Sequence, residues 1–259
     1  MTTGRVLVIA GSDSGGGAGI QADLKTVMAL GGYAQTAITA ITAQNSLAVQ
    51  AIWPVPPEII TAQIRSALAD IGADAIKTGM LGDAATIEAV CDSLENTRLP
   101  LVVDPVMIAK GGASLLAAEA LATLKSRLLP RATLLTPNLP EAAALTCRTI
   151  DSEASMRRAL EDLLQLGPKN VLLKGGHLPG DDLVDLLATE GEVIAFRSRR
   201  IATRHTHGTG CTLASAIATS LAQGMKLPDA VARAHAYVAK AIATAPGLGA
   251  GHGPLNHAR

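Results

Sequence analysis

Two glycine-rich segments hold the residues of this chain that are best suited to bind an anion. The first is Gly11–Gly19, and the second is formed by Gly208, Thr209, Gly210 and Cys211. Glycine allows a backbone to approach a ligand closely, and the N-terminus of a helix attracts negative charge. The second segment comes just before an amphipathic helical pattern, so it predicts an anion site. The positive end of that helix would lower the pKa of the Cys211 thiol; the alternative is an ordinary helix cap with a structural cysteine.

The first glycine segment departs from the common nucleotide-binding patterns. A P-loop requires Lys and then Ser or Thr where this chain has Gly17-Ala18. A dinucleotide-binding G-x-G-x-x-G opens directly from its strand, whereas the matching glycines here start too late. A hydrolase elbow has a serine at its centre, where this chain has Asp13. The segment is therefore a ligand-binding loop of another kind or simply a flexible loop.

Three charged residues stand where buried runs end. Asp104 follows Leu101–Val103, and Glu141 follows Asn138. Both acids could hold Mg²⁺ through water, although each taken alone is more often a cap or a surface residue. Lys174 ends the apolar run Val171–Leu173, so it needs a phosphate or a carboxylate partner.

The cysteines and the paired histidines indicate neither a disulfide framework nor a metal centre. Cys91, Cys147 and Cys211 are odd in number and far apart, which favours a reducing, cytoplasmic setting. We expect Cys91 and Cys147, which fall on helical patterns, to lie in the core. His205 and His207 have no evident third ligand, and we expect them to belong to a loop.

Short apolar runs alternate with longer amphipathic segments along the whole chain, which predicts an α/β fold with a mostly parallel sheet covered on both faces. The predicted strands are Val6–Ala10, Ala37–Ala43, Asp74–Thr78, Leu101–Asp104, Thr133–Thr136 and Val171–Lys174. Leu183–Ala188 and Val193–Phe196 predict an antiparallel hairpin at one edge. The predicted helices are Gln21–Leu30, Pro57–Asp70, Ala84–Leu94, Leu115–Leu128, Pro140–Thr146, Ser152–Leu166, Thr209–Gln223 and Pro228–Thr244. Ligands of such sheets bind at the carboxyl ends of the strands. Residues that end or follow the predicted strands include Gly11, Gln44, Met80, Asp104, Asn138 and Glu141.

Composition excludes several functional classes. The 259 residues are 48% hydrophobic and 17% charged, so disorder is excluded. Twenty-two basic and 22 acidic residues cancel, which removes the electrostatic case for nucleic acid or an anionic membrane as the main partner. No apolar stretch is long enough to span a membrane, and the N-terminal apolar run predicts a strand rather than a signal peptide. We expect a single domain over residues 1–259.

Seven segments together resemble the bacterial hydroxymethylpyrimidine/phosphomethylpyrimidine kinases of thiamine biosynthesis, which belong to the ribokinase superfamily. In chain order they are GSDSGGGAGIQADLKT, TAITAQNS, KTGML, VVDPVM, LTPNLPEA, VLLKGGH and HGTGCTLASAI. Each segment alone is a weak signal, whereas their common order is specific. The resemblance extends over nearly the whole chain.

This resemblance implies a ribokinase-like three-layer αβα fold, a homodimer, and two phosphoryl transfers from ATP with Mg²⁺. The acceptors would be 4-amino-5-hydroxymethyl-2-methylpyrimidine and then its monophosphate. The residues implied around the pyrimidine are Gly11, Asp23, Gln44, Met80 and Val106. Asn138, Glu141 and Lys174 would serve ATP, and Asp104 and Glu141 would serve Mg²⁺. Gly208, Thr209, Gly210 and Cys211 would form the catalytic anion hole, with Cys211 acting either as a general base or as part of that hole.

Three other functions compete with this interpretation. A pyridoxal or pyridoxine kinase of the same superfamily would phosphorylate a similar hydroxymethyl heterocycle. A nucleotide-binding regulator without catalysis would be expected to lack Asp104, Lys174 or Cys211, and all three are present. A dinucleotide oxidoreductase is excluded by its missing fingerprint. One departure from the family pattern is His235, which stands where many members have lysine. The resemblance therefore does not imply a phosphate contact from the last helix.

Overall fold

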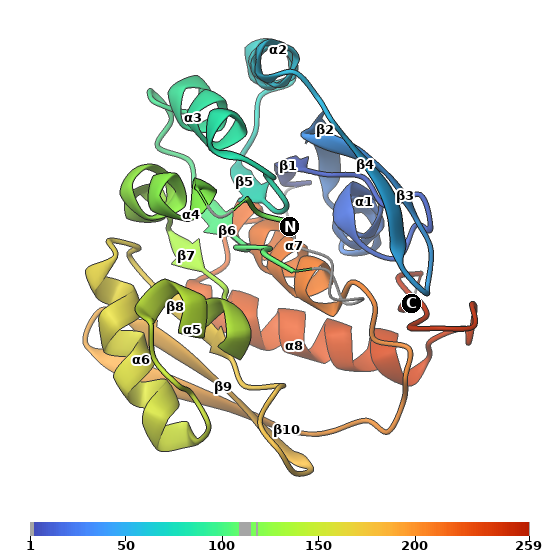
Figure 1. Cartoon of the computed structure of the whole chain (residues 1–259), viewed down its shortest axis with the longest axis vertical. Helices are drawn as coiled ribbons and strands as arrows, with labels where there is room; N and C mark the ends of the chain where they lie inside the picture. Colours follow the sequence, from blue (N-terminus) through green and yellow to red (C-terminus); the bar gives the residue numbers. More distant parts are fainter. Residues whose placement is uncertain (1–2, 109–114, 118, 259) are drawn as a thin grey trace.

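The computed structural model describes residues 3–108, 115–117 and 119–258. Within these residues a central sheet of eight strands has the order β10-β9-β8-β7-β6-β5-β1-β2 (Figure 1). Neighbours from β2 to β8 run parallel, and β9 and β10 form the antiparallel hairpin at the edge. The strands are β1 (Arg5–Ala10), β2 (Tyr33–Ile38), β5 (Ala75–Thr78), β6 (Leu101–Val103), β7 (Leu134–Leu135), β8 (Val171–Lys174), β9 (Asp182–Thr189) and β10 (Glu192–Arg199).

Helices cover both faces of this sheet, because successive side chains of each buried strand point to opposite sides. Val6 and Val8 of β1 pack in one core with α1 (Gly19–Ala29), α7 (Thr209–Ala222) and α8 (Leu227–Ala243). Leu7 and Ile9 pack in the other core, against the helices on the opposite face. These are α2 (Pro57–Ala69), α3 (Ala84–Ser93), α4 (Ala120–Thr123), α5 (Leu139–Thr146) and α6 (Glu153–Gln165). The predicted three-layer αβα architecture is thus confirmed.

The single strand predicted over Ala37–Ala43 is wrong. The chain leaves the central sheet after β2 and starts β3 (Ala40–Gln44), which pairs with β4 (Val49–Pro54) in a separate two-stranded ribbon. Thr39 marks the break: its N–H donates to the Ala10 carbonyl, and its hydroxyl donates to the Met80 carbonyl at 2.6 Å. No glycine or proline marks this switch between sheets, so the apolar run gave no sign of it.

The helix predicted over Leu115–Leu128 starts later, at Ala120 of α4, and continues in a π-helical turn over Leu124–Leu128. The backbone before it bonds to neighbouring loops instead, since Leu115 N–H donates to the Met107 carbonyl and Ala117 N–H to the Gly82 carbonyl. Residue 118 of that prediction lies outside the described residues. A 3₁₀ turn over Leu129–Arg131 then leads into β7.

The carboxyl ends of β1, β5, β6 and β8 open on the same edge of the sheet, as parallel strands require. Helix α7 packs beneath these strands, in contact with β1, β5 and β6. Its N-terminus therefore meets the loops that follow them (Figure 1). In the described part of the chain no helix has the length and apolarity needed to cross a bilayer.

Candidate active site

Lys174 and Asp104 form an ion pair at the centre of this edge. The Lys174 ammonium lies 3.0 Å from Asp104 Oδ1, and the two side chains are only 14% and 3% exposed. Thr136 donates a hydrogen bond of 3.2 Å to the same carboxylate oxygen. Burial opposes the charge of Lys174, but the carboxylates of Asp104 and Glu141 outweigh it and raise the lysine pKa. The expectation that Lys174 needs a charged partner is confirmed.

The N-terminus of α7 lies directly against this pair. Helix α7 begins at Thr209, with Gly208 as its N-cap at φ +82°. A Cβ at Gly210 would sit 3.3 Å from the Lys174 ammonium and 3.5 Å from Asp104 Oδ2. A side chain at this position would press on the ion pair, so glycine lets the first turn of α7 lie close to the lysine. The structure therefore brings the predicted anion hole and the predicted ATP lysine together.

The two glycine segments are packed against each other. A Cβ at Gly208 would lie only 1.8 Å from the carbonyl oxygen of Gly17, and one at Gly11 would lie 2.5 Å from the methyl carbon of Met80. Asp13 accepts hydrogen bonds from the N–H groups of Gly17 and Ala18 and gives this loop a defined shape. The first glycine segment is thus a hydrogen-bonded turn that packs against the second.

Asn138 and Glu141 cap α5 in a reciprocal capping box. Asn138 Oδ1 accepts from Glu141 N–H at 2.9 Å, and Glu141 Oε2 accepts from Asn138 N–H at 2.8 Å. Burial and the nearby negative charge of Asp104 raise the pKa of Glu141 to about 7, although the positive charge of Lys174 opposes this rise. The plain structural role anticipated for these two residues is therefore present, next to the ion pair.

The acidic residues suit a cation that arrives with phosphate groups better than a resident metal. Among the described residues, no three His, Cys, Asp or Glu side chains are arranged to hold a metal ion. Mg²⁺ is commonly held by one or two carboxylates together with substrate phosphates. Burial and the negative charge of Asp104 both disfavour the ionised form of Glu141, and a cation near the two carboxylates would counter both effects. Asp104 and Glu141 fit Mg²⁺ on those terms.

The predicted lowering of the Cys211 pKa is wrong. Cys211 lies in the first turn of α7 as expected, and part of its surface is exposed. Loss of water around the thiol, together with the carboxylates of Asp23 and Asp104, outweighs the opposing effect of Lys77 and raises the thiol pKa to about 11. The dipole argument overlooked this burial and the two buried acids. Cys211 is therefore a neutral thiol near pH 7.

The expectation that Asp23 contacts the pyrimidine is also corrected. Its side chain is fully buried in the ion pair with Lys77, whose ammonium lies 3.0 and 2.9 Å from the two carboxylate oxygens. Ser215, one turn after Cys211 on α7, donates a 2.6 Å hydrogen bond to the same carboxylate. Burial opposes the charge of Lys77, but Asp23 raises the lysine pKa above its ordinary value. Asp23 supports the floor of the site and has no free oxygen at its surface.

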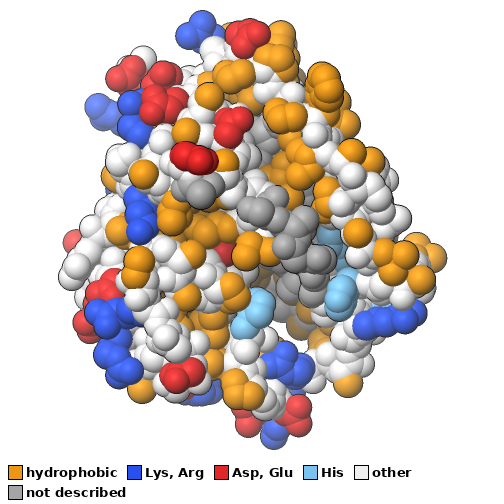
Figure 2. Space-filling model, in the orientation of Figure 1, with side chains coloured by type: hydrophobic (Ala, Val, Ile, Leu, Met, Phe, Trp, Pro, Cys, Tyr) orange, Lys and Arg blue, Asp and Glu red, His pale blue; other side chains and the backbone are white. Residues whose placement is uncertain are grey.

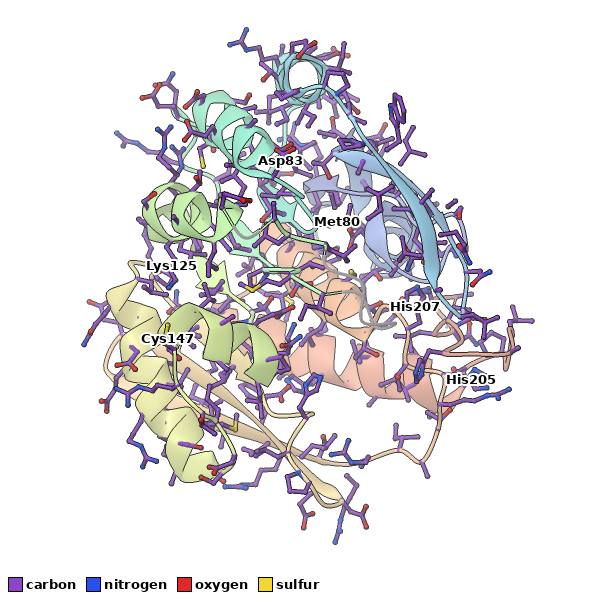
Figure 3. The ribbon with its side chains drawn as sticks, viewed as in Figure 1. Met80, Asp83, Lys125, Cys147, His205 and His207 are labelled. Atoms are coloured by element: carbon purple, nitrogen blue, oxygen red, sulfur yellow. The ribbon has the colours of Figure 1, made fainter. Side chains whose placement is uncertain are left out.

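The other residues expected around the pyrimidine lie at the rim of the site. Gly11 touches Met80, and Val106 follows Asp104, to whose carbonyl its N–H donates at 2.9 Å. Met80 also lines a cavity of about 330 Å³ beside the β3–β4 ribbon. Gln44 ends β3, and its amide nitrogen lies 3.4 Å from Nε2 of His207, which Figure 3 labels. The ribbon, and not the central sheet, therefore supplies Gln44.

The sequence model of the phosphomethylpyrimidine kinases matches residues 13–256. The chain belongs to this phosphomethylpyrimidine kinase family. It is 53% identical to the hydroxymethylpyrimidine/phosphomethylpyrimidine kinase of Streptomyces coelicolor, over 97% of this chain and 93% of that protein. It is 54% identical to the thiamine biosynthesis bifunctional protein ThiED of Geobacter sulfurreducens, over 98% of this chain. The match spans about half of that protein, 52% of its length.

The fold of this phosphomethylpyrimidine kinase family member is shared with a pyridoxal kinase. The structure of the pyridoxal kinase from Staphylococcus aureus in complex with AMP-PCP and pyridoxal superimposes with a TM-score of 0.91 at 35% identity. The alignment covers 100% of this chain and 94% of that one. This chain and that pyridoxal kinase thus share one fold.

Several residues of the site region in this family member were missed or misplaced by sequence reasoning. Lys77 lies in the fully buried strand β5, and a lysine within such a short strand run was the signal in the sequence that it needs a charged partner. His235 stacks on Phe196 with ring centroids 5.2 Å apart and lies 3.3 Å from Asp185 Oδ2. Cys147 is exposed at the left-handed end of α5, contrary to the predicted core position, while Cys91 is buried.

Proposed function

We propose that this protein transfers the γ-phosphoryl group of ATP to the hydroxymethyl group of 4-amino-5-hydroxymethyl-2-methylpyrimidine. It then phosphorylates the resulting monophosphate to the diphosphate. The observation that carries the proposal is the contact between the Lys174–Asp104 pair and Gly210 at the start of α7. Identity of 53% to a hydroxymethylpyrimidine/phosphomethylpyrimidine kinase, against 35% to a pyridoxal kinase, supports this acceptor.

The chain's own groups can supply the two things that phosphoryl transfer requires, alignment and neutralisation of charge. The N–H groups at the start of α7 would bind the equatorial oxygens of the transferring group, where negative charge gathers. The Lys174 ammonium would bind the oxygens on the ATP side. A Mg²⁺ ion bound with ATP near Asp104 and Glu141 would add a second positive charge. Cys211, as a thiol, would donate a weak hydrogen bond in this cradle instead of removing a proton.

The proposal also covers the residues that bind the nucleotide and the acceptor ring, the oligomeric state and the cellular compartment. Asn138 and Glu141 would lie beside the phosphates of ATP, as their position next to Lys174 supports. Gly11, Gln44, Met80 and Val106 would surround the ring. A homodimer in the cytoplasm, with no nucleic acid or membrane partner, completes the proposal.

A kinase assay with three acceptors tests this function. We expect ATP-dependent phosphorylation of hydroxymethylpyrimidine and of its monophosphate, each with a kcat/KM well above that for pyridoxal. Pyridoxal is the second candidate because the S. aureus pyridoxal kinase shares the whole fold. Preference for pyridoxal, or failure on the monophosphate, would reject the dual pyrimidine function.

A further inference from the structure

Helix α7 begins without a side-chain cap. Its N-cap is Gly208, at φ +82°, which has no side chain to accept a hydrogen bond from the first turn. The N–H groups of a first helical turn have no partner inside the helix, and a capping side chain usually satisfies one of them. Glycine leaves these groups to an anion, as the proposed function requires. The position of the turn must therefore be fixed by contacts from outside the helix.

His207, the residue before this N-cap, makes such a contact, and Figure 3 labels it on the loop that leads into α7. Its Nε2 lies 2.8 Å from Asp13 Oδ2 in the first glycine segment, and the two side chains are 12% and 2% exposed. The imidazole also packs on Gly17, where a Cβ would lie 2.6 Å from His207 Cδ2. The backbone N–H of His207 donates to the Gly253 carbonyl at 3.1 Å. Both the side chain and the main chain of His207 are thus held.

The Asp13 carboxylate accepts four hydrogen bonds, as many as its two oxygens have lone pairs. Oδ1 accepts from Gly15 N–H at 2.8 Å. Oδ2 accepts from the N–H groups of Gly17 and Ala18, at 3.0 and 2.8 Å, and faces His207 Nε2. Burial alone would raise the pKa of Asp13, but the bonds from His207, Ala18 and Gly15 hold it below its ordinary value. Asp13 is therefore ionised, and the one proton on His207 Nε2 is donated to it.

These bonds connect the first glycine segment to the start of α7. Asp13 holds the turn of its own loop and the His207 ring through the same carboxylate oxygen. Three residues after His207, a Cβ at Gly210 would lie 3.3 Å from the Lys174 ammonium and 3.5 Å from Asp104 Oδ2. A shift of His207 would therefore move the first turn of α7 relative to Lys174.

We propose that His207, held by Asp13, is a positioning residue that sets the first turn of α7 against Lys174 and so aligns the phosphoryl group for transfer. This inference rests on the proposed function, in which the first turn of α7 binds the transferring group. A misplacement of about 1 Å can cost about a hundredfold in rate. A contact that serves alignment affects kcat more than substrate binding.

The test is His207→Phe, which keeps a flat ring against Gly17 but removes the N–H that Asp13 accepts. We expect kcat to fall by about tenfold or more for both phosphorylations, because the same helical turn serves both steps. The KM for ATP should change by less than about threefold, since the pair of Lys174 and Asp104 is untouched. His207→Gln should restore most of kcat, because its amide N–H can reach the position of the Nε2 proton.

Amide hydrogen exchange at Thr212 provides a measurement that does not depend on kinase activity. The Thr212 N–H donates to the Gly208 carbonyl at 2.9 Å and closes the first turn of α7. This amide should exchange faster in His207→Phe than in wild type, and at nearly the wild-type rate in His207→Gln.

His205→Phe is the matched control, because His205 precedes α7 on the same loop (Figure 3). Within the described part of the chain, its Nδ1 is buried without a hydrogen-bond partner, so an apolar ring there removes no bond to a carboxylate. We expect kcat and the exchange rate at Thr212 to stay at their wild-type values.

Asp13→Asn tests whether His207 acts through Asp13, and it keeps the inference testable if His207→Phe folds poorly. The amide has the shape of the carboxylate but only one acceptor oxygen, so kcat should fall here as well. In the double variant Asp13→Asn/His207→Phe, the loss in kcat should be smaller than the product of the two single losses, because both changes remove one shared contact.

The outcomes separate this inference from the proposed function. Unchanged kcat in His207→Phe and Asp13→Asn, an equal loss in His205→Phe, or a loss that His207→Gln does not restore would overturn the positioning role while the kinase function stood. Losses that simply multiply in the double variant would overturn the action through Asp13. Wild-type protein that phosphorylates neither hydroxymethylpyrimidine nor its monophosphate would overturn the proposed function and this inference with it.

Discussion

At the scale of single residues, Lys174 is held in place by its ion pair with Asp104. The pair is nearly buried, and Asp104 keeps a second hydrogen bond from Thr136. In Lys174→Ala we expect the KM for ATP to rise and kcat to fall by at least about tenfold, since the proposed function has this cation bind the oxygens on the ATP side. Binding of the pyrimidine, measured by calorimetry, should be nearly unchanged.

The control for this prediction is Lys174→Arg, which retains a positive charge beside the otherwise unpaired Asp104. It should unfold near the wild-type temperature and keep more activity than the alanine variant. Normal ATP kinetics in a folded Lys174→Ala protein would show that the lysine is only structural.

The second prediction at this scale concerns Cys211, whose raised pKa determines which of the two phosphorylation steps should be slowed by its loss. A general base must lose its proton first, and a thiol with a pKa of about 11 is protonated at neutral pH. A base would matter mainly for the first step, because the monophosphate of the second step is already ionised at pH 7. We therefore expect Cys211→Ala to slow both phosphorylations by a similar factor. Separate assays of each step would contradict this if only the first were slowed.

At the scale of elements, the two ends of α7 provide a matched pair of glycines. Gly208 at the N-cap and Gly224 after the C-terminus both have positive φ, +82° and +84°. A Cβ at Gly208 would collide with the Gly17 carbonyl, whereas one at Gly224 would meet no atom within 4 Å. Gly224→Ala should thus cost only the backbone strain of about 1–2 kcal/mol and keep activity. Gly208→Ala should lose more stability and nearly all activity.

Chemical denaturation and the kinase assay on both variants check this prediction. The difference between them isolates the close approach of the two glycine segments, since the backbone conformation is matched. Equal activity in the two variants would show that the approach of Gly208 to Gly17 is not needed for catalysis.

At the scale of the whole molecule, His257 connects the C-terminal segment to α7 and α8 by hydrogen bonds. Its Nε2 lies 2.9 Å from the Thr212 hydroxyl on α7, and Tyr237 of α8 donates to its carbonyl. Burial, helped by the charge of Lys25, lowers its pKa from 6.5 to about 4. Between these values the unfolded chain binds a proton that the folded chain does not. Stability from this histidine is therefore complete above pH 6.5 and lost as the pH falls toward 4.

We expect wild-type protein to lose about 2 kcal/mol of unfolding free energy from pH 6.5 to 4.5 relative to His257→Gln, at roughly 1.4 kcal/mol per pH unit. The difference between the two proteins is the quantity to measure. The raised pKa of Glu141 makes the folded protein more stable as the pH falls over this range. Both proteins contain Glu141, so this effect cancels in the difference between wild type and His257→Gln. Parallel pH profiles from urea denaturation would contradict the assignment.

The predicted homodimer also belongs to this scale. Ile41 and Trp53 are paired across the β3–β4 ribbon and are 56% and 73% exposed, on the side of the molecule where Figure 2 shows hydrophobic side chains. Such a surface is typical of an interface. We expect a dimer of the 26.4 kDa chain in light scattering, converted to monomer by Trp53→Glu but not by Leu248→Glu, an exposed control on the C-terminal segment. A monomeric wild-type protein would reject the dimer.

The sequence by itself determined the layered α/β fold and which segments meet at the site. Alternating apolar runs and amphipathic segments imply parallel strands, and parallel strands bring their following residues to one edge. Lys174 and Asp104 could be assigned to one region for that reason, whereas Gly208–Cys211 was predicted as an anion site from its glycines before a helix. The order of the motifs indicated the family.

Tertiary structure alone decided the electrostatic roles and the partners across segments. The pKa of Cys211 depends on Asp23 and Asp104, which stand 188 and 107 positions before it in the chain. The pairing of Asp13 with His207 joins loops at opposite ends of the sequence, and Thr39 turns the chain into a second sheet without a local signal. Local sequence patterns report burial and periodicity, whereas ionisation and hydrogen-bond direction depend on neighbours that only folding brings together.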